Sequence, residues 1–153
     1  MTDSPFLPPL LVLDTNVVLD WLYFSDPACS LLSSVIRDWQ VRWIASPAMR
    51  AETEHVLHRG IHAKRSADAE SVMAAWDTWA SMRPALDEPS PAAMRCTDPD
   101  DQKFIDFALR SGASALLTRD RAVLKLARGA RGRGLWIETA VAWQQRWAMR
   151  NRP

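Results

Sequence analysis

The stretch that most constrains the fold is the apolar run Leu10-Leu11-Val12-Leu13, which ends at Asp14. Two prolines precede the run, so it is predicted to be a short strand with a defined start. A strand that is apolar at every position is typical of the centre of a parallel sheet, because helices cover both of its faces there. Open sheets of this kind bind ligands at the carboxyl ends of their strands. Asp14 is therefore predicted to lie in a functional site.

Strand-like and helix-like segments alternate along the rest of the chain. Further strands are expected at 41–45, 115–118 and 135–137, with a short extended piece at 93–96. Helices are expected at 17–24, 30–38, 48–57, 66–82, 98–110 and 139–149, and loops at 83–91 and at the basic, glycine-containing stretch 128–134. This alternation predicts an α/β fold with a central parallel sheet of four to five strands, covered on both faces.

The length of the chain predicts the number of domains, and its charges are unevenly distributed along the sequence. The 153 residues are predicted to form a single domain, with a core over about 10–143 and a basic C-terminal helix and tail over 139–153. Residues 1–109 carry 9 basic and 16 acidic side chains, whereas residues 110–153 carry 10 and 2. This asymmetry suits a metal site beside an anionic ligand such as nucleic acid, and an ordinary solvated arginine-rich surface would explain it equally well.

The cysteines and the N-terminus indicate the compartment. Cys29 and Cys96 are isolated, so the sequence predicts reduced thiols and neither a zinc site nor a disulfide framework. No basic residue precedes the first apolar stretch, and Asp14 and Asp20 interrupt it. We therefore expect a cytoplasmic protein with no signal peptide and no membrane span.

Acidic side chains recur where strands end or the next helices begin. They are Asp14, Glu52, the run Asp98 to Asp101, and Asp120. Because the carboxyl ends of parallel strands share one edge of a sheet, these acids are expected to converge. Clustered carboxylates repel one another unless a cation neutralises them, and oxygen ligands favour Mg²⁺ or Mn²⁺.

Some of these acids also have a purely structural interpretation. Asp98 precedes Pro99, which favours a helix N-cap over a ligand. Asp101 lies three and four residues before two apolar positions and shares their buried face, so a metal explains it better. Asp120 could begin a turn, but Thr118 beside it favours function.

Four motifs carry a family resemblance. The segments V-L-D-T-N (12–16), S-P (46–47) with Glu52, D-P-D-D-Q-K-F (98–104) and L-L-T-R-D (116–120) resemble, in order and spacing, the successive motifs of the PIN domain. The resemblance covers about residues 10–143. It implies a three-layer α/β/α sandwich and a divalent-metal-dependent ribonuclease site. The D-P-D-D-Q-K-F run resembles the branch described as toxins of toxin–antitoxin pairs.

The resemblance also implies roles for individual residues. The family's metal-binding acids correspond to Asp14, Glu52, Asp101 and Asp120, with Asn16 and Thr118 as the polar residues beside them. In many relatives the third acid directly precedes the position of Lys103, but Gln102 stands there in this chain. The third role therefore passes to Asp101 or to Asp98.

Basic and aromatic residues suggest contacts with a ligand or with a second subunit. Phosphate contacts are expected from Arg119, Arg128, Arg131 and Arg133. Trp143 and Trp147 could stack on single-stranded RNA, but burial in a subunit interface is favoured, which predicts a homodimer. The three histidines at 55, 58 and 62 lack a zinc signature and are interpreted as surface residues.

The sequence as a whole favours an endoribonuclease that hydrolyses RNA phosphodiester bonds, with an antitoxin protein as a further expected partner. A phosphatase with an aspartyl nucleophile is disfavoured, because Asn16 stands where a second aspartate is needed. A phosphoacceptor domain would need a late lysine where Arg119 stands. A non-catalytic module that keeps the fold and binds nucleic acid or a protein remains the alternative.

Overall fold

The centre of the structure is a parallel sheet whose middle strand is the apolar run at the start of the chain. The computed structural model describes residues 7–59, 68–84 and 94–152. Within these residues five parallel strands occur in the order β3-β2-β1-β4-β5. They are β1 (Leu10–Leu13), β2 (Arg42–Ala45), β3 (Ala80–Met82), β4 (Ala115–Leu117) and β5 (Trp136–Glu138). Leu11 of β1 pairs with Trp43 on one side and Ala115 on the other.

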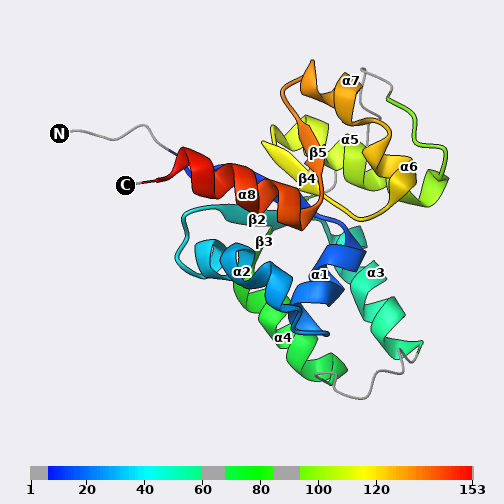
Figure 1. Ribbon diagram of the computed structural model, residues 1–153. Helices are drawn as coiled ribbons and strands as arrows, with labels where there is room; N and C mark the ends of the chain where they lie inside the picture. The colour runs from blue at the N-terminus through cyan, green and yellow to red at the C-terminus, as the bar shows by residue number, and fades with distance from the viewer. Residues whose placement is uncertain (1–6, 60–67, 85–93, 153) are drawn as a thin grey trace.

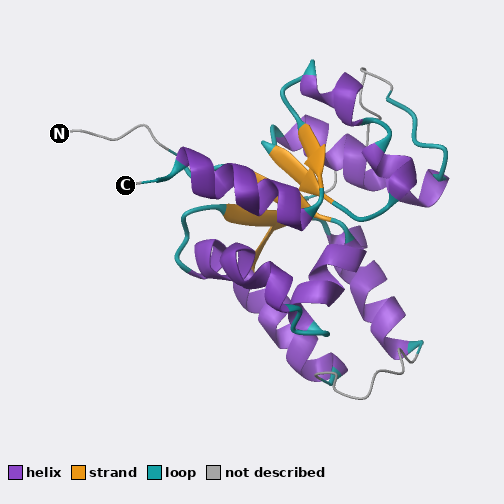
Figure 2. Cartoon of the chain, in the orientation of Figure 1, coloured by secondary structure: helices purple, strands orange, loops and turns teal. Residues whose placement is uncertain are grey.

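Helices cover both faces of this sheet (Figures 1 and 2). They are α1 (Thr15–Leu22), α2 (Ser30–Arg37), α3 (Pro47–His58), α4 (Ala69–Trp79), α5 (Gln102–Ser111), α6 (Arg121–Leu124), α7 (Ala127–Arg131) and α8 (Ala140–Arg150), with short 3₁₀ turns η1 (Pro27–Cys29) and η2 (Pro99–Asp101). Right-handed crossovers place α1 to α4 on one face and α5 to α7 on the other. The last helix, α8, returns to the first face and contacts α2. The predicted three-layer α/β/α architecture is confirmed.

The core explains why β1 lies in the middle of the sheet. Leu11 and Val12 are fully buried, as a strand covered on both faces requires. On the neighbouring strand, Trp43 of β2 packs edge-on against two other tryptophans. Its ring centroid lies 5.6 Å from that of Trp21 and 5.1 Å from that of Trp76. These large rings fix α1 and α4 against the sheet. No helix of the described ranges is long and apolar enough to cross a membrane.

One expected helix is shorter than predicted, and its end is a strand. The segment 66–82 was expected to be helical throughout, but α4 ends at Trp79 and β3 follows directly. Ala80 pairs with Trp43 and packs against the core, so the chain enters the sheet directly at the end of the helix. Helical spacing alone does not reveal that switch. Of the extended piece expected at 93–96, residues 94–96 form no strand and Ala93 lies outside the described residues.

The basic stretch 128–134 was expected to be a loop, and this expectation was wrong. Its first half forms α7, and α6 precedes it. Ala130 is fully buried, and the guanidinium of Arg131 lies 4.0 Å from the centre of the Trp136 ring. A Cβ on Gly129 would meet Met94 Cε at 3.1 Å, so the glycine marks a close approach of α7 to the chain before η2. Packing against β5 thus orders a segment whose composition suggested a loop.

Candidate metal centre

Asp14 is positioned by the end of β1 and the beginning of α1. It is the N-cap of α1, and its Oδ1 accepts a hydrogen bond from the Thr15 backbone N–H at 2.7 Å. Only 4 % of the residue is exposed. Burial raises the pKa of Asp14, the hydrogen bonds from Thr118 and Thr15 lower it, and the charges of Glu52 and Asp120 raise it further. A buried carboxylate at a central strand end is thus present, as predicted.

Thr118 connects the ends of β1 and β4. Its hydroxyl donates to Asp14 Oδ2 at 2.7 Å and accepts the backbone N–H of Asp120 at 2.9 Å. The residue is fully buried, so both contacts are shielded from water. One hydroxyl therefore fixes the relative position of two acids that are far apart in the sequence.

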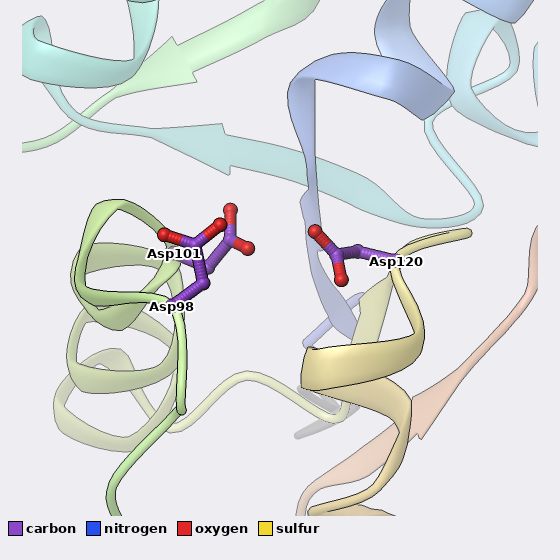
Figure 3. A group of neighbouring side chains, drawn as sticks. All are labelled: Asp98, Asp101 and Asp120. Carbon is purple, nitrogen blue, oxygen red and sulfur yellow. The ribbon is translucent and has the colours of Figure 1, made fainter.

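Three aspartates approach one another at this edge of the sheet (Figure 3). One carboxylate oxygen each from Asp98, Asp101 and Asp120 lie within 4.8 Å of one another. Asp98 and Asp101 bracket η2, whereas Asp120 faces them as the N-cap of α6. Asp98 accepts from the Asp100 backbone N–H at 3.0 Å, and Asp120 from that of Ala122 at 2.8 Å. The predicted capping role of Asp98 is thus confirmed, and the same side chain also belongs to the acidic group.

Asp101 is the member of this group whose environment is least compatible with an ordinary carboxylate. Its pKa rises to about 7, first because burial disfavours the charged form, next because a hydrogen bond with the Asp120 side chain favours the protonated form, and then because the charges of Asp14, Asp120 and Asp98 repel it. Its Oδ2 is buried, and no hydrogen-bond donor of the described residues reaches that atom. An acceptor left in this condition destabilises the fold unless a proton or a cation satisfies it.

Glu52 is close enough to Asp14 to raise its pKa, and its own charge is compensated by a lysine. Its Oε1 accepts from Lys103 Nζ at 2.6 Å, and its Oε2 accepts from the Thr15 hydroxyl. Glu52 comes from α3 and Lys103 from the first turn of α5, so the ion pair joins helices on opposite faces of the sheet. Sequence reasoning had not assigned Lys103 a partner, because the two residues are 51 positions apart.

Asn16 and Arg119 continue the network away from the acids. The Asn16 side chain donates to Asp14 Oδ2 at 3.4 Å and accepts the Arg119 backbone N–H at 3.1 Å. The Arg119 guanidinium binds both oxygens of Asp20, at 2.6 and 3.0 Å. Arg119 was expected to contact phosphate, but in this structure its charged group stabilises α1 through Asp20.

The other predicted ligand-binding residues lie at the surface or in other contacts. Arg128, Arg131 and Arg133 are all exposed, and the Arg131 guanidinium also stacks on the Trp136 ring. His55 and His58 are exposed on α3, in keeping with their interpretation as surface residues, and His62 lies outside the described residues. Trp143, expected in a subunit interface, is buried within the chain with 3 % of its surface exposed.

Residues 10–122 match the PIN domain family. The chain belongs to the PIN domain family. The matched segment of this PIN domain includes all five acids described above and ends just after Asp120. It leaves out α7, β5 and α8, so the family match does not cover the last basic and tryptophan-rich segment.

A solved structure shares the fold of this PIN domain. A chain of the crystal structure of VapBC2 from Rickettsia felis, bound to a DNA fragment from their promoter, superposes with a TM-score of 0.58 and 12% sequence identity. The similarity covers 85% of the present chain and 98% of that chain. At this identity the likeness concerns the fold alone. No curated protein matches the sequence.

Proposed function

We propose that this PIN domain is an endoribonuclease that depends on Mg²⁺ or Mn²⁺ and hydrolyses phosphodiester bonds in RNA. The single observation that carries the proposal is the buried, unpartnered Oδ2 of Asp101 within a group of three converging carboxylates. Membership of the PIN domain family supports it. Asp98, Asp101 and Asp120 are the proposed ligands, with Asp14 and Glu52 as the neighbouring acids.

The residues present fit a hard divalent cation. The three converging groups offer only carboxylate oxygens, which Mg²⁺ and Mn²⁺ prefer. Cys96 lies nearby, but burial raises the pKa of its thiol, so the thiol stays protonated and is a poor ligand. When bound, such an ion supplies activation of a water molecule and stabilisation of charge on the leaving oxygen.

The chain's own residues have three tasks in this proposal. Thr118 and the Thr15 backbone hold Asp14 in one orientation, and Lys103 holds Glu52. The exposed arginines Arg128 and Arg133 belong to the basic final third of the chain, which suits the RNA backbone. This positive charge counters the repulsion between the RNA backbone and the acids, which is strongest when no cation is bound.

The test compares three substitutions that remove the same charge. Asp101→Asn and Asp120→Asn are expected to abolish Mn²⁺ uptake in calorimetry and cleavage of a labelled single-stranded RNA. Asp100→Asn is the matched control, because Asp100 is exposed, adjacent in sequence and outside the converging group. Full cleavage by the Asp101 and Asp120 variants would overturn the proposal. RNA binding by the unaltered protein without any uptake of divalent ions would instead favour the non-catalytic binding module.

We further propose that the protein is the toxin of a toxin–antitoxin pair, inhibited by a partner protein. The D-P-D-D-Q-K-F run and the shared fold with a VapBC2 chain support this role. Expression is expected to arrest growth, and Asp120→Asn to relieve the arrest. Harmless expression of an active nuclease would contradict it. A homodimer stays a prediction, and the sedimentation velocity of the purified protein would test it.

A further inference from the structure

Two adjoining cavities lie at the amino-terminal edge of the sheet, opposite the acidic group. Their volumes are about 480 and 210 Å³, and Pro9, Trp147 and Arg150 line both of them. Pro9 directly precedes β1 and Ser114 directly precedes β4, whereas Asp98 and Asp101 lie at η2 and Asp120 follows β4, at the other edge. In Figure 1 the end of α8 and the beginning of β1 lie together, away from α6. We call these two spaces the aromatic cavity.

Tryptophan rings dominate the walls of the aromatic cavity. Trp39 lines the larger space, and Trp136 and Trp143 line the smaller one. Trp147 stacks on Trp143 with ring centroids 5.3 Å apart and 23° between the planes. Because Trp143 is buried and Trp147 only partly so, Trp147 is the ring of this pair that is accessible from the cavity.

Trp39 directly follows the C-cap of α2, and its ring is exposed beside the larger space. Its φ is +58°, a left-handed conformation that disfavours any residue with a Cβ, and half of the residue is exposed. The Trp39 ring packs against the ring of Trp79 in a tilted arrangement, with centroids 5.9 Å apart. The left-handed conformation belongs to the end of α2, where the Trp39 N–H donates to the Ile36 carbonyl and the Gln40 N–H to that of Val35, so what marks this position is the exposed ring.

The charges around the aromatic cavity are positive. Arg146 lies on the Trp136 ring, 4.0 Å from its centre, and forms an ion pair with Glu138. Arg150 is exposed, and no ion pair joins it to any residue in the described part of the chain. No acidic residue of the described ranges lines either space. An uncompensated guanidinium therefore lies beside accessible indole rings.

We propose that the aromatic cavity binds a segment of single-stranded nucleic acid, with bases stacked on Trp39 and Trp147 and a backbone phosphate at Arg150. Every base offers a flat face to an indole, and a guanidinium binds phosphate with little regard to sequence. A paired duplex does not expose those faces. The site goes beyond the proposed nuclease activity, because it lies at the other edge of the sheet and needs no divalent ion.

The experiment measures binding without cleavage. A fluorescein-labelled, single-stranded RNA of about 12 nucleotides, within the usual range of such sites, is titrated with the full chain in EDTA and followed by anisotropy. Trp39→Asn removes the ring, and asparagine tolerates the left-handed conformation, so the variant keeps its fold. Arg150→Ala removes the uncompensated charge. The matched controls are Phe24→Ala and Arg59→Ala, an exposed ring and an exposed arginine away from the cavity.

Trp39→Asn is expected to weaken binding about tenfold, and Arg150→Ala to lower the salt dependence by about 0.7 in logarithmic slope. The two controls, Phe24→Ala and Arg59→Ala, are expected to leave the affinity unchanged. Single-stranded DNA of the same sequence is expected to bind as well, and the matching duplex to bind weakly. Equal affinity of wild type, Trp39→Asn and Arg150→Ala, or preference for the duplex, would overturn the proposal. A variant that loses cleavage of RNA but keeps its affinity in EDTA would report on the metal centre and not on the aromatic cavity.

Discussion

The Thr118 hydroxyl donates a hydrogen bond to Asp14 across 104 residues of sequence, at 2.7 Å and away from water. Because the same oxygen accepts the Asp120 backbone N–H, the spacing of two proposed site acids depends on one side chain. Asp14 also accepts hydrogen bonds from the Thr15 backbone N–H and the Asn16 amide, and Asp120 accepts one from the Ala122 backbone N–H.

Thr118→Val keeps the shape of the side chain and removes its hydroxyl. We expect the free energy of unfolding to fall by about 1–3 kcal/mol, since a buried carboxylate and a buried N–H each lose a partner. Urea denaturation measures this change. Thr118→Ser retains the hydroxyl and is expected to lose less stability and to keep cleavage activity. A valine variant as stable as wild type would contradict the bridging role.

The ion pair between Lys103 and Glu52 should tune the affinity of the acidic edge for cations. Lys103→Met leaves the Glu52 charge uncompensated next to Asp14, and we expect Mn²⁺ to bind a few times more tightly as a result. Calorimetry measures the affinity. Lys103→Arg keeps the charge and serves as the control, and Glu52→Gln is expected to weaken binding. Weaker binding by the methionine variant would show that Lys103 does not oppose the ion.

The raised pKa of Asp101 predicts how the stability of the metal-free protein depends on pH. In the folded protein the pKa of Asp101 is about 7, whereas in the unfolded chain it is near the ordinary value of 3.8. Between these values the folded state holds more protons, so the free energy of unfolding decreases as the pH rises, and levels off above pH 7. Asp14, whose pKa is also raised, acts in the same direction.

Urea midpoints in EDTA at pH 5 and pH 8 measure this dependence. The midpoint is expected to be lower at pH 8, and Asp101→Asn is expected to reduce the difference, because the amide does not titrate. Asp100→Asn, which lies outside the converging group, is expected to leave it as in wild type. A midpoint that rises from pH 5 to pH 8 in EDTA would contradict the predicted sign.

Arg119 is expected to contribute to folding more than to RNA binding. Its guanidinium is engaged by Asp20, and the arginine side chain is 58% exposed, so Arg119→Ala should cost less than about 1 kcal/mol. Its effect on RNA affinity should be smaller than that of Arg133→Ala, whose side chain is exposed in the basic final third. Anisotropy with labelled RNA compares the two. A larger loss for Arg119→Ala would restore its predicted role in phosphate contact.

The strands formed by continuous apolar runs could be predicted from the sequence, whereas β3 could not. Leu10-Leu11-Val12-Leu13 and the run before Thr118 are apolar at every position, a pattern that surface helices rarely show. Ala80–Met82 is only three residues long and follows α4 without a break, so its apolar residues continue the helical pattern. Only its pairing with β2 distinguishes it from a last helical turn.

For the candidate site, the sequence could predict only that the acids lie at the same edge of the sheet. Parallel topology alone places Asp14, Asp101 and Asp120 at the same edge, so this part of the prediction requires only the order of strands and helices. The partners of these and other charges depend on the packed helices. Lys103 reaches Glu52 and Arg119 reaches Asp20 across 51 and 99 residues, and no local pattern links either pair. Whether a charged group binds a ligand or another side chain is therefore decided by tertiary structure.

Asp98 and Asp101 stand at one end of a chain segment and Asp120 at the other, with α5 and β4 between them. An ion shared by these three residues would act as a reversible cross-link that closes this segment into a ring. Closing a loop restricts the unfolded chain, so cross-linking favours the native state beyond the removal of charge repulsion. Chelation should then speed amide hydrogen exchange in α5 before it affects β1 or β2.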